Sequence, residues 1–150
     1  MFWQSVGPSD AGTTNTGTAP VEVIWVTPKP VITATATTPP PVVLDSEARH
    51  IHYPNIPGED LFENEQIIVQ RFVMQPGQWE GVHAHTPNSL YIFVKGGQWL
   101  SRTYRNPKQA SGDSPDGSVG WMEPVDIKEG HESGNVGKAS SEVVWVLFKQ

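Results

Sequence analysis

Residues 77–97 read GQWEGVHAHTPNSLYIFVKGG, with His83 and His85 two positions apart in a segment flanked by apolar residues. Side chains alternate between the two faces of a β-strand, so this spacing predicts that both imidazoles lie on the same face. Neighbouring imidazoles are typical of a transition-metal site. The stretch therefore predicts an extended segment that carries two metal ligands.

A second stretch, GWMEPVDIKEGHESGN (residues 120–135), contains His131, forty-six positions after His85. Together the two stretches resemble the two signature motifs of the cupin superfamily, which are small β-barrels that usually carry one metal ion. The first motif is Gly, five residues, His-x-His, three or four residues, Glu, six residues and Gly. The second is Gly, five residues, Pro-x-Gly, two residues, His, three residues and Asn. The resemblance covers about residues 63–150 and implies an all-β double-stranded β-helix, or jelly-roll, barrel.

The two stretches match the family pattern at the ligand histidines, at several glycines and at the asparagine, and they depart from it at three positions. The matching positions are Gly77, His83, His85, Gly120, His131 and Asn135, together with a closing glycine at 96 or 97. The motif glutamate is absent, because its position holds Ser89 on the three-residue spacing and Leu90 on the four-residue spacing. In the second motif, Asp126 and Lys128 stand where Pro and Gly are usual. Asn135 is expected to order a turn through side-chain hydrogen bonds to the backbone.

Composition sets the broad class. A chain of 150 residues with 37% hydrophobic residues, 14 glycines and 14 prolines suits one all-β domain rich in turns. The net charge of −6 argues against nucleic acid or an anionic membrane as a partner. The absence of cysteine excludes disulfides and thiolate ligands. With neither a signal-peptide pattern nor an apolar run of about 18 residues, we expect a cytoplasmic protein.

Residues 1–44 form an N-terminal extension that differs from the domain expected over residues 45–150. The extension holds seven of the 14 prolines and a Thr/Pro-rich linker, and within it residues 21–26 (VEVIWV) predict a strand. Residues 15–30 align without gaps on residues 135–150, with eight identities in sixteen positions. We interpret this as one cupin domain preceded by the last strand of another, a remnant of a tandem repeat.

This remnant carries no metal ligand, because Ala11 falls opposite His131 in the extended alignment. An apolar strand left unpaired in water would template aggregation, so we expect the 21–26 strand to dock on a sheet edge. The linker is long enough to reach a second subunit. A homodimer built by strand exchange is therefore the favoured prediction, with docking on the same chain as the alternative.

Within the domain, β-branched and aromatic runs predict strands, and turn residues predict what separates them. The expected strands are 66–74, 90–94, 98–104, 118–122 and 142–148. The polar stretch 106–117 predicts a long loop, and residues 46–49 are the only helix candidate. A second His-x-His pair, His50 and His52, lacks motif spacing and predicts two surface histidines.

Three neutral imidazoles from His83, His85 and His131 would bind one divalent transition metal, with Fe(II) favoured and Zn, Ni, Mn or Cu as alternatives. Without the motif carboxylate, the metal unit keeps its +2 charge and favours an anionic, chelating substrate. Among cupins, three-histidine iron sites resemble those of thiol dioxygenases and of an enzyme that cleaves β-diketones. Non-redox lyase chemistry on a carbonyl compound is an alternative.

Three residues are candidates for catalytic roles beside the metal. Glu80 is a general base or an exposed rim carboxylate. Tyr91, like Trp79, lines a pocket or packs in the core or at a dimer face. Arg71 binds a substrate carboxylate or forms a surface ion pair. The sequence thus leaves two classes open: a metal-dependent enzyme acting on a small organic acid or carbonyl compound, and a non-catalytic or metal-free small-molecule binder.

Overall fold

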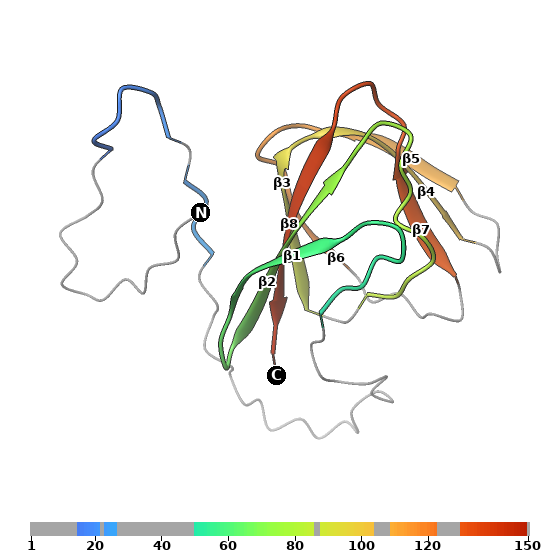
Figure 1. The fold of residues 1–150 in the computed structure, drawn as a ribbon, viewed down its shortest axis with the longest axis horizontal. Helices are drawn as coiled ribbons and strands as arrows, with labels where there is room; N and C mark the ends of the chain where they lie inside the picture. The colour runs from blue at the N-terminus through green and yellow to red at the C-terminus, as the bar shows by residue number, and fades with distance from the viewer. Residues whose placement is uncertain are drawn as a thin grey trace, which may run out of the picture. The chain divides into compact units, whose positions relative to one another are not determined.

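The computed structural model describes residues 15–21, 23–26, 50–85, 88–103, 109–122 and 130–149 (Figure 1). All regular structure among these residues is β-strand, which confirms the all-β prediction. The eight strands are β1 (Gly58–Glu63), β2 (Ile67–Met74), β3 (Ser89–Lys95), β4 (Gly97–Thr103), β5 (Gln109–Ser114), β6 (Val119–Met122), β7 (His131–Asn135) and β8 (Ser141–Phe148).

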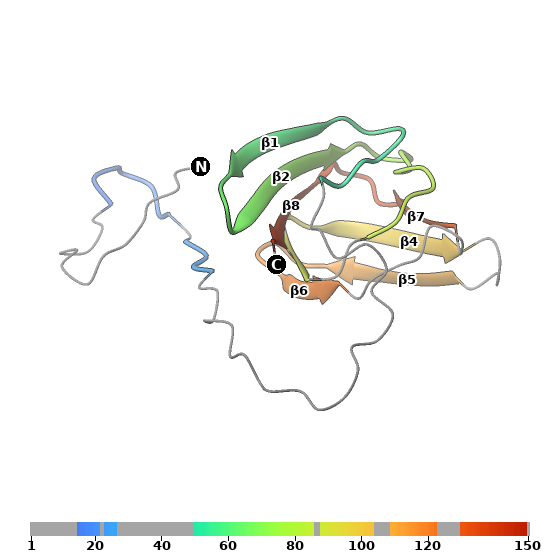
Figure 2. The ribbon, with the colours of Figure 1, turned by 90° about the horizontal axis from the view of Figure 1, so that it is seen from below.

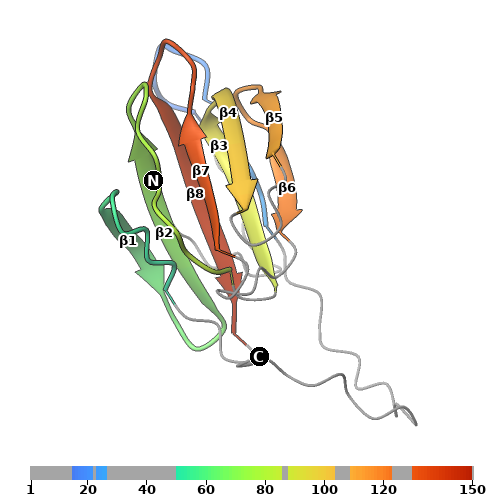
Figure 3. The ribbon, with the colours of Figure 1, turned by 90° about the vertical axis from the view of Figure 1, so that its right-hand side faces the viewer.

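The strands form two antiparallel sheets that face each other (Figure 2). The larger sheet has the order β1-β2-β8-β3-β6, and the smaller has the order β5-β4-β7 (Figure 3). The last strand, β8, therefore lies between β2 and β3, and it pairs with β2 along its whole length from Ile67↔Phe148 to Met74↔Ser141. This arrangement of strands is the double-stranded β-helix that the motifs imply.

The core lies between the sheets and is filled mainly by one face of β2 and β8. The register places Phe72 opposite Val143 and Gln70 opposite Trp145 on that inner face. The buried apolar cluster comprises Ile51, Tyr53, Ile56, Ile68, Phe72, Met74, Val143, Trp145 and Leu147. Each such side chain contributes about 1.5–3 kcal/mol when fully buried, so this cluster holds the barrel together independently of any metal.

Several expected strands are confirmed, and one predicted loop is wrong. Residues 109–114 form β5 and pair with β4 from Gly97↔Ser114 to Arg102↔Gln109. The sequence QASGDS has little strand preference, but its small residues fit beneath β4. A Cβ atom at Gly112 would lie 2.9 Å from Trp99 Cζ2, so the indole needs a glycine there. Strands β1 and β7 were also not among the expected strands.

The N-terminal segment is described over residues 15–21 and 23–26. None of these residues forms a strand within the single chain, and the side chains of Val21, Val23 and Trp25 are 65%, 58% and 64% exposed. Strand pairing of residues 21–26 with a second subunit therefore stays a prediction. The helix candidate at residues 46–49 lies outside the described residues. In the described part of the chain, no helix has the length and apolar character needed to cross a membrane.

Candidate metal centre

The three motif histidines come from two segments that run side by side. Residues 77–83 follow β2 and run antiparallel to β7, with a hydrogen bond from the Gly77 N–H to the Asn135 carbonyl (2.7 Å). At the other end, the His83 N–H donates to the His131 carbonyl at 2.9 Å. This bridge sets His83 directly opposite His131. Alternation along the extended backbone then brings His85 to the same side as His83.

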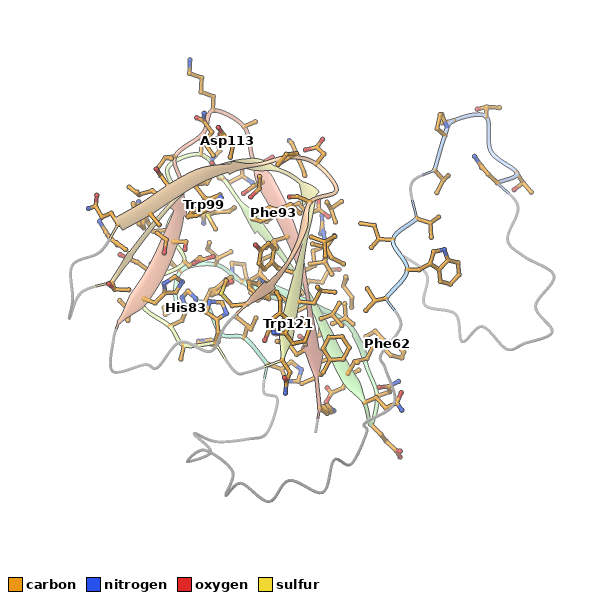
Figure 4. The ribbon with its side chains drawn as sticks, turned by 180° about the vertical axis from the view of Figure 1, so that it is seen from behind. Phe62, His83, Phe93, Trp99, Asp113 and Trp121 are labelled. Carbon is orange, nitrogen blue, oxygen red and sulfur yellow. The ribbon has the colours of Figure 1, made fainter. Side chains whose placement is uncertain are left out.

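The three imidazoles converge inside the barrel. Each offers one ligand nitrogen, and these nitrogens all lie within 4.8 Å of one another. The Nε2 atoms of His83 and His85 are 2.8 Å apart, and the ring centroids of the three pairs are separated by 4.6–5.4 Å. Figure 4 shows the His83 side chain within the barrel. An ion about 2.0–2.1 Å from each nitrogen requires ligand nitrogens about 3–3.5 Å apart, so the most widely separated nitrogens must approach each other by about 1 Å to share one ion.

In His83 and His131 the Nδ1 atom contacts a neighbouring polar group, so that the Nε2 atom is available to bind a metal. The Nδ1–H of His83 donates to the Gly81 carbonyl at 2.8 Å, which fixes the tautomer with a lone pair on Nε2. The His131 Nδ1 lies 3.3 Å from the Ser101 Oγ. His85 Nδ1 is buried and has no hydrogen-bond partner within the described residues. Two of the three ligands are thus oriented by a neighbouring group, as metal-binding histidines usually are.

Burial keeps the cluster uncharged. Desolvation lowers the pKa of His83 to about 4 and that of His85 to about 3, and it also lowers the pKa of His131. All three imidazoles are therefore neutral at pH 7, which is the form that binds a metal. The donor set fits a divalent transition metal such as Fe(II), Zn, Ni, Mn or Cu.

Glu80 lies beside this cluster instead of on an exposed rim. Its side chain is buried, and its Oε2 atom is 3.8 Å from His83 Nε2. The Ser133 N–H donates to the same oxygen at 2.9 Å, while the Glu80 N–H donates to the Ser133 carbonyl at 2.9 Å. Burial raises the pKa of Glu80 to about 7, against the lowering effect of the Ser133 hydrogen bond. The carboxyl group is thus held in one orientation next to the metal ligands.

The structure does not bring Tyr91 or Arg71 to the histidines. The Tyr91 ring packs against Phe93 and Trp145, with centroid separations of 5.7 and 5.5 Å. Tyr91 is therefore a packing residue of the inner face. Arg71 pairs with Glu142 (2.7 Å) and Glu59 (2.9 Å), on the opposite side of β2 from the core residues. These ion pairs fit the alternative of a paired surface charge, because a one-residue step along a strand reverses the direction of the side chain.

Two aromatic residues near the cluster were not predicted. The Tyr53 ring lies 4.6 Å from the His83 ring, and the Trp145 ring lies 5.0 Å from the His85 ring. Burial, together with the nearby Glu80 carboxylate, raises the pKa of Tyr53 well above its ordinary value. Neither residue belongs to a motif. Trp145 could have been proposed from the alternation in β8, but nothing around Tyr53 points to the site.

The motif positions without a ligand have clear structural roles. Ser89 replaces the glutamate on the inner face, because it pairs with the core residue Leu147 and is fully buried. Leu90 points to the other face of β3. Asn135 orders the turn after β7 by donating to the Met74 carbonyl (3.1 Å) and the Ala139 carbonyl (2.8 Å), as predicted.

The remaining aromatic and histidine candidates lie away from the cluster. Trp79 stacks on the Arg102 guanidinium at 3.9 Å and packs over the backbone of Gly134. His50 approaches Asp60 (3.6 Å) and Glu63 (3.4 Å), in agreement with its prediction as a surface residue.

Several solved structures are similar to this chain. The chain is similar to the crystal structure of a cupin domain from Bordetella pertussis Tohama I, with 20% sequence identity over 65% of this chain and 96% of that one, and a TM-score of 0.53. A protein with a double-stranded β-helix domain from Klebsiella pneumoniae has 17% identity over 70% of this chain and 85% of that one, with a TM-score of 0.47. A Cupin 2 conserved barrel domain protein from Salinispora arenicola has 17% identity over 76% and 90% of the two chains, also with a TM-score of 0.47. No family model matches the sequence, and no curated protein matches it.

Proposed function

We propose that this chain, which has the cupin fold, is a metal-dependent enzyme that acts on a small organic acid or carbonyl compound, as a dioxygenase or a lyase. The observation that carries the proposal is the convergence of three neutral imidazoles, with ligand nitrogens within 4.8 Å of one another and a buried carboxyl group beside them. A structural metal site would have no need of a buried carboxyl that stands next to the ligands and is held by a backbone N–H.

His83, His85 and His131 hold the ion in this proposal, with Fe(II) as the favoured metal. When bound, such an ion supplies Lewis acidity and, in the case of iron, redox chemistry. Because all three ligands are uncharged, the ion keeps its +2 charge. The site therefore favours a substrate that brings its own negative charge, such as a carboxylate or an enolate.

Glu80 is the proton acceptor in this proposal. Its Oε2 atom is 3.8 Å from a ligand nitrogen, and this short distance supports a role towards a substrate held at the metal. The Ser133 N–H fixes the carboxyl group in that direction (2.9 Å). In the metal-free chain burial raises the pKa of Glu80 to about 7, and such a carboxyl group can accept a proton from a substrate C–H or O–H bond and return it later.

Tyr53 and Trp145 supply the apolar walls. Their rings lie against His83 and His85 respectively and are almost fully buried. Such walls exclude water and strengthen the electrostatic interactions between the residues and a charged substrate.

Metal analysis of the purified full chain after anaerobic incubation with Fe(II) tests the first half of the proposal. We expect about one ion per chain in the native protein and almost none in a His131→Ala variant with an unchanged circular dichroism spectrum. The catalytic part of the proposal is tested by first screening carboxylic acids and β-dicarbonyl compounds for turnover by the native chain. The Glu80→Gln variant should then retain the metal but no longer turn over the substrates that the screen identifies. A native chain that takes up no metal would refute the proposal.

A metal-free binder is the second candidate, and the replacement of the motif glutamate by the buried Ser89 favours it. That replacement removes one anionic ligand and therefore weakens the hold on any divalent ion. Native mass spectrometry separates the two candidates. A retained organic ligand together with an empty metal site would support the binder.

A further inference from the structure

The N-terminal segment repeats the hydrogen bonds of the turn after β7 as well as the sequence of residues 135–150. In the barrel, the Asn135 side chain donates from Nδ2 to the Ala139 carbonyl (2.8 Å), and its Oδ1 accepts from the Gly137 N–H (2.9 Å). In the N-terminal segment, Asn15 makes the same two bonds, with the Ala19 carbonyl (2.7 Å) and the Gly17 N–H (2.9 Å). The residue numbers differ by 120 in every case. Residues 15–19 thus form a turn with the same hydrogen bonds as residues 135–139, which lead into β8.

The strand that follows each turn has a different environment in the two copies. In the barrel it becomes β8, with Trp145 only 4% exposed between the two sheets. The equivalent Trp25 is 64% exposed in the single chain, and Ile24 is 40% exposed. Side chains on both faces of this segment are apolar, as they are in β8. The segment therefore has the sequence character of a paired strand, although none of its described residues forms a strand.

We propose that residues 15–26 dock on a second copy of this chain, where residues 21–26 add as a strand to the free edge of β6. The docking is reciprocal, so two chains exchange their N-terminal segments in a two-fold symmetric dimer. The inference does not rest on the proposed catalytic function.

A comparison of the sheet edges selects β6. β6 pairs only with β3 in the described structure, and its Val119 and Trp121 side chains are 50% and 52% exposed. Trp121 also stacks on Phe148 of β8, with a centroid separation of 5.8 Å, so the apolar surface continues across the sheet. An added strand would cover these side chains with its own.

The other edges are less suitable for an apolar strand. β1 presents Glu59, Asp60 and Glu63, which protect an edge by charge and would repel the carboxylate of Glu22. β5 has the polar sequence QASGDS. The outer side of β7 is already bridged by Trp79 and His83. Among the described strands, β6 is the edge that is both exposed and apolar.

The sequence between the segment and the barrel favours docking on a second copy. Residues 27–44 contain five prolines and a Thr-rich run. Proline-rich spacers favour extended conformations, with about 3.1 Å per residue in polyproline II, and they return poorly to their starting point. Such a spacer is better suited to reaching a neighbouring barrel than to folding back on its own.

Cysteine cross-linking tests the partner directly, because the native chain has no cysteine. One full-length chain carries Val23→Cys and another carries Val119→Cys. On mixing under mild oxidation, we expect a disulfide between the two chains. The matched control replaces the exposed Ala110 of β5 by Cys and should cross-link at least about tenfold more slowly. A rate equal to that of the control would overturn the choice of β6.

Light scattering of the full chain tests the dimer independently. We expect twice the chain mass of 16.5 kDa for the native protein and for Val136→Lys, an exposed apolar position (49%) outside β6. Trp25→Lys and Val119→Lys should both shift the protein to monomer with an unchanged circular dichroism spectrum. A monomeric native chain would overturn the proposal, as would a chain with Val23→Cys and Val119→Cys that closes its disulfide only within itself.

Discussion

The Oε2 atom of Glu80 lies 3.8 Å from the Nε2 atom of His83, inside a barrel whose motif glutamate is missing. The carboxyl group reaches this point because residues 77–83 run alongside β7, where the Ser133 N–H donates to it at 2.9 Å. A carboxyl group therefore stands beside the three histidines, although it comes from a different position in the chain than the family motif provides. This arrangement leads to four predictions that single substitutions and titrations can check.

Removing a histidine ligand should abolish metal uptake and leave the barrel folded. We expect His83→Ala to lower metal affinity by more than about 100-fold, because a ligand matters more than the groups around it. The fold should persist, because the apolar cluster around Phe72, Trp145 and Leu147 stabilises it without the metal. Metal analysis and circular dichroism of the same sample measure both effects. A variant that no longer folds would instead assign the cluster a structural role.

Glu80→Gln should separate catalysis from metal binding. The amide cannot accept a proton, so we expect turnover to fall by about 10²–10⁴-fold while one metal per chain is retained. The control is Glu59→Gln, which alters an exposed ion pair of β1 with Arg71 and should leave turnover unchanged. If Glu80→Gln also loses the metal, the carboxylate is a ligand and not a proton acceptor.

The stability of the metal-free protein should depend on pH in two opposing ways. His83 and His85 have pKa values of about 4 and 3 in the folded state, against an ordinary 6.5. Because the unfolded chain binds protons more readily, the free energy of unfolding should decrease as pH falls from about 6.5 towards 4. Glu80 has a pKa of about 7 against 4.5, so it withdraws stability as pH rises from about 4.5 to 7. Urea denaturation at several pH values should show both slopes. Only the second should vanish in Glu80→Gln, and its persistence there would contradict the assignment.

Gly81→Ala should disturb the site through the backbone. Gly81 has φ +83°, and an added Cβ would lie 3.0 Å from Asn55 Nδ2 and from Pro54 Cβ. We expect a loss of about 1–3 kcal/mol in unfolding free energy and weaker metal binding, because the Gly81 carbonyl orients His83. Gly77→Ala is the matched control, with φ +77° and nothing within 4 Å of the added Cβ. Its unfolding free energy should decrease only by the cost of placing an alanine at positive φ. Equal losses in the two variants would show that crowding at Gly81 plays no part.

The ligand histidines and the barrel could be predicted from sequence because both depend on local spacing. The period of two fixes the side on which His83 and His85 lie, and the distance to His131 identifies the second motif. β8 was predictable from its run of Val and Trp. These features require no knowledge of which segments meet in space.

The remaining features depend on contacts between distant segments. β5 has no intrinsic strand preference and forms because it pairs with β4 beneath Trp99. Glu80 is buried because its segment pairs with β7, where it is bonded to Ser133, fifty-three residues away. Arg71 was expected at the site, yet the register of β2 turns it outward to Glu59 and Glu142. Tyr53 reaches His83 from a segment before the first strand, and no local pattern indicates this.

X-ray absorption spectroscopy of the full chain, loaded anaerobically with Fe(II), tests the central claim most directly. The three-histidine site predicts about one iron per chain, with a first coordination shell at about 2.0–2.2 Å and the outer-shell scattering of three imidazole rings. His131→Ala should lower the imidazole count by one in any iron that remains. A spectrum without imidazole scattering, or iron that dialysis removes from the native chain, would contradict the account.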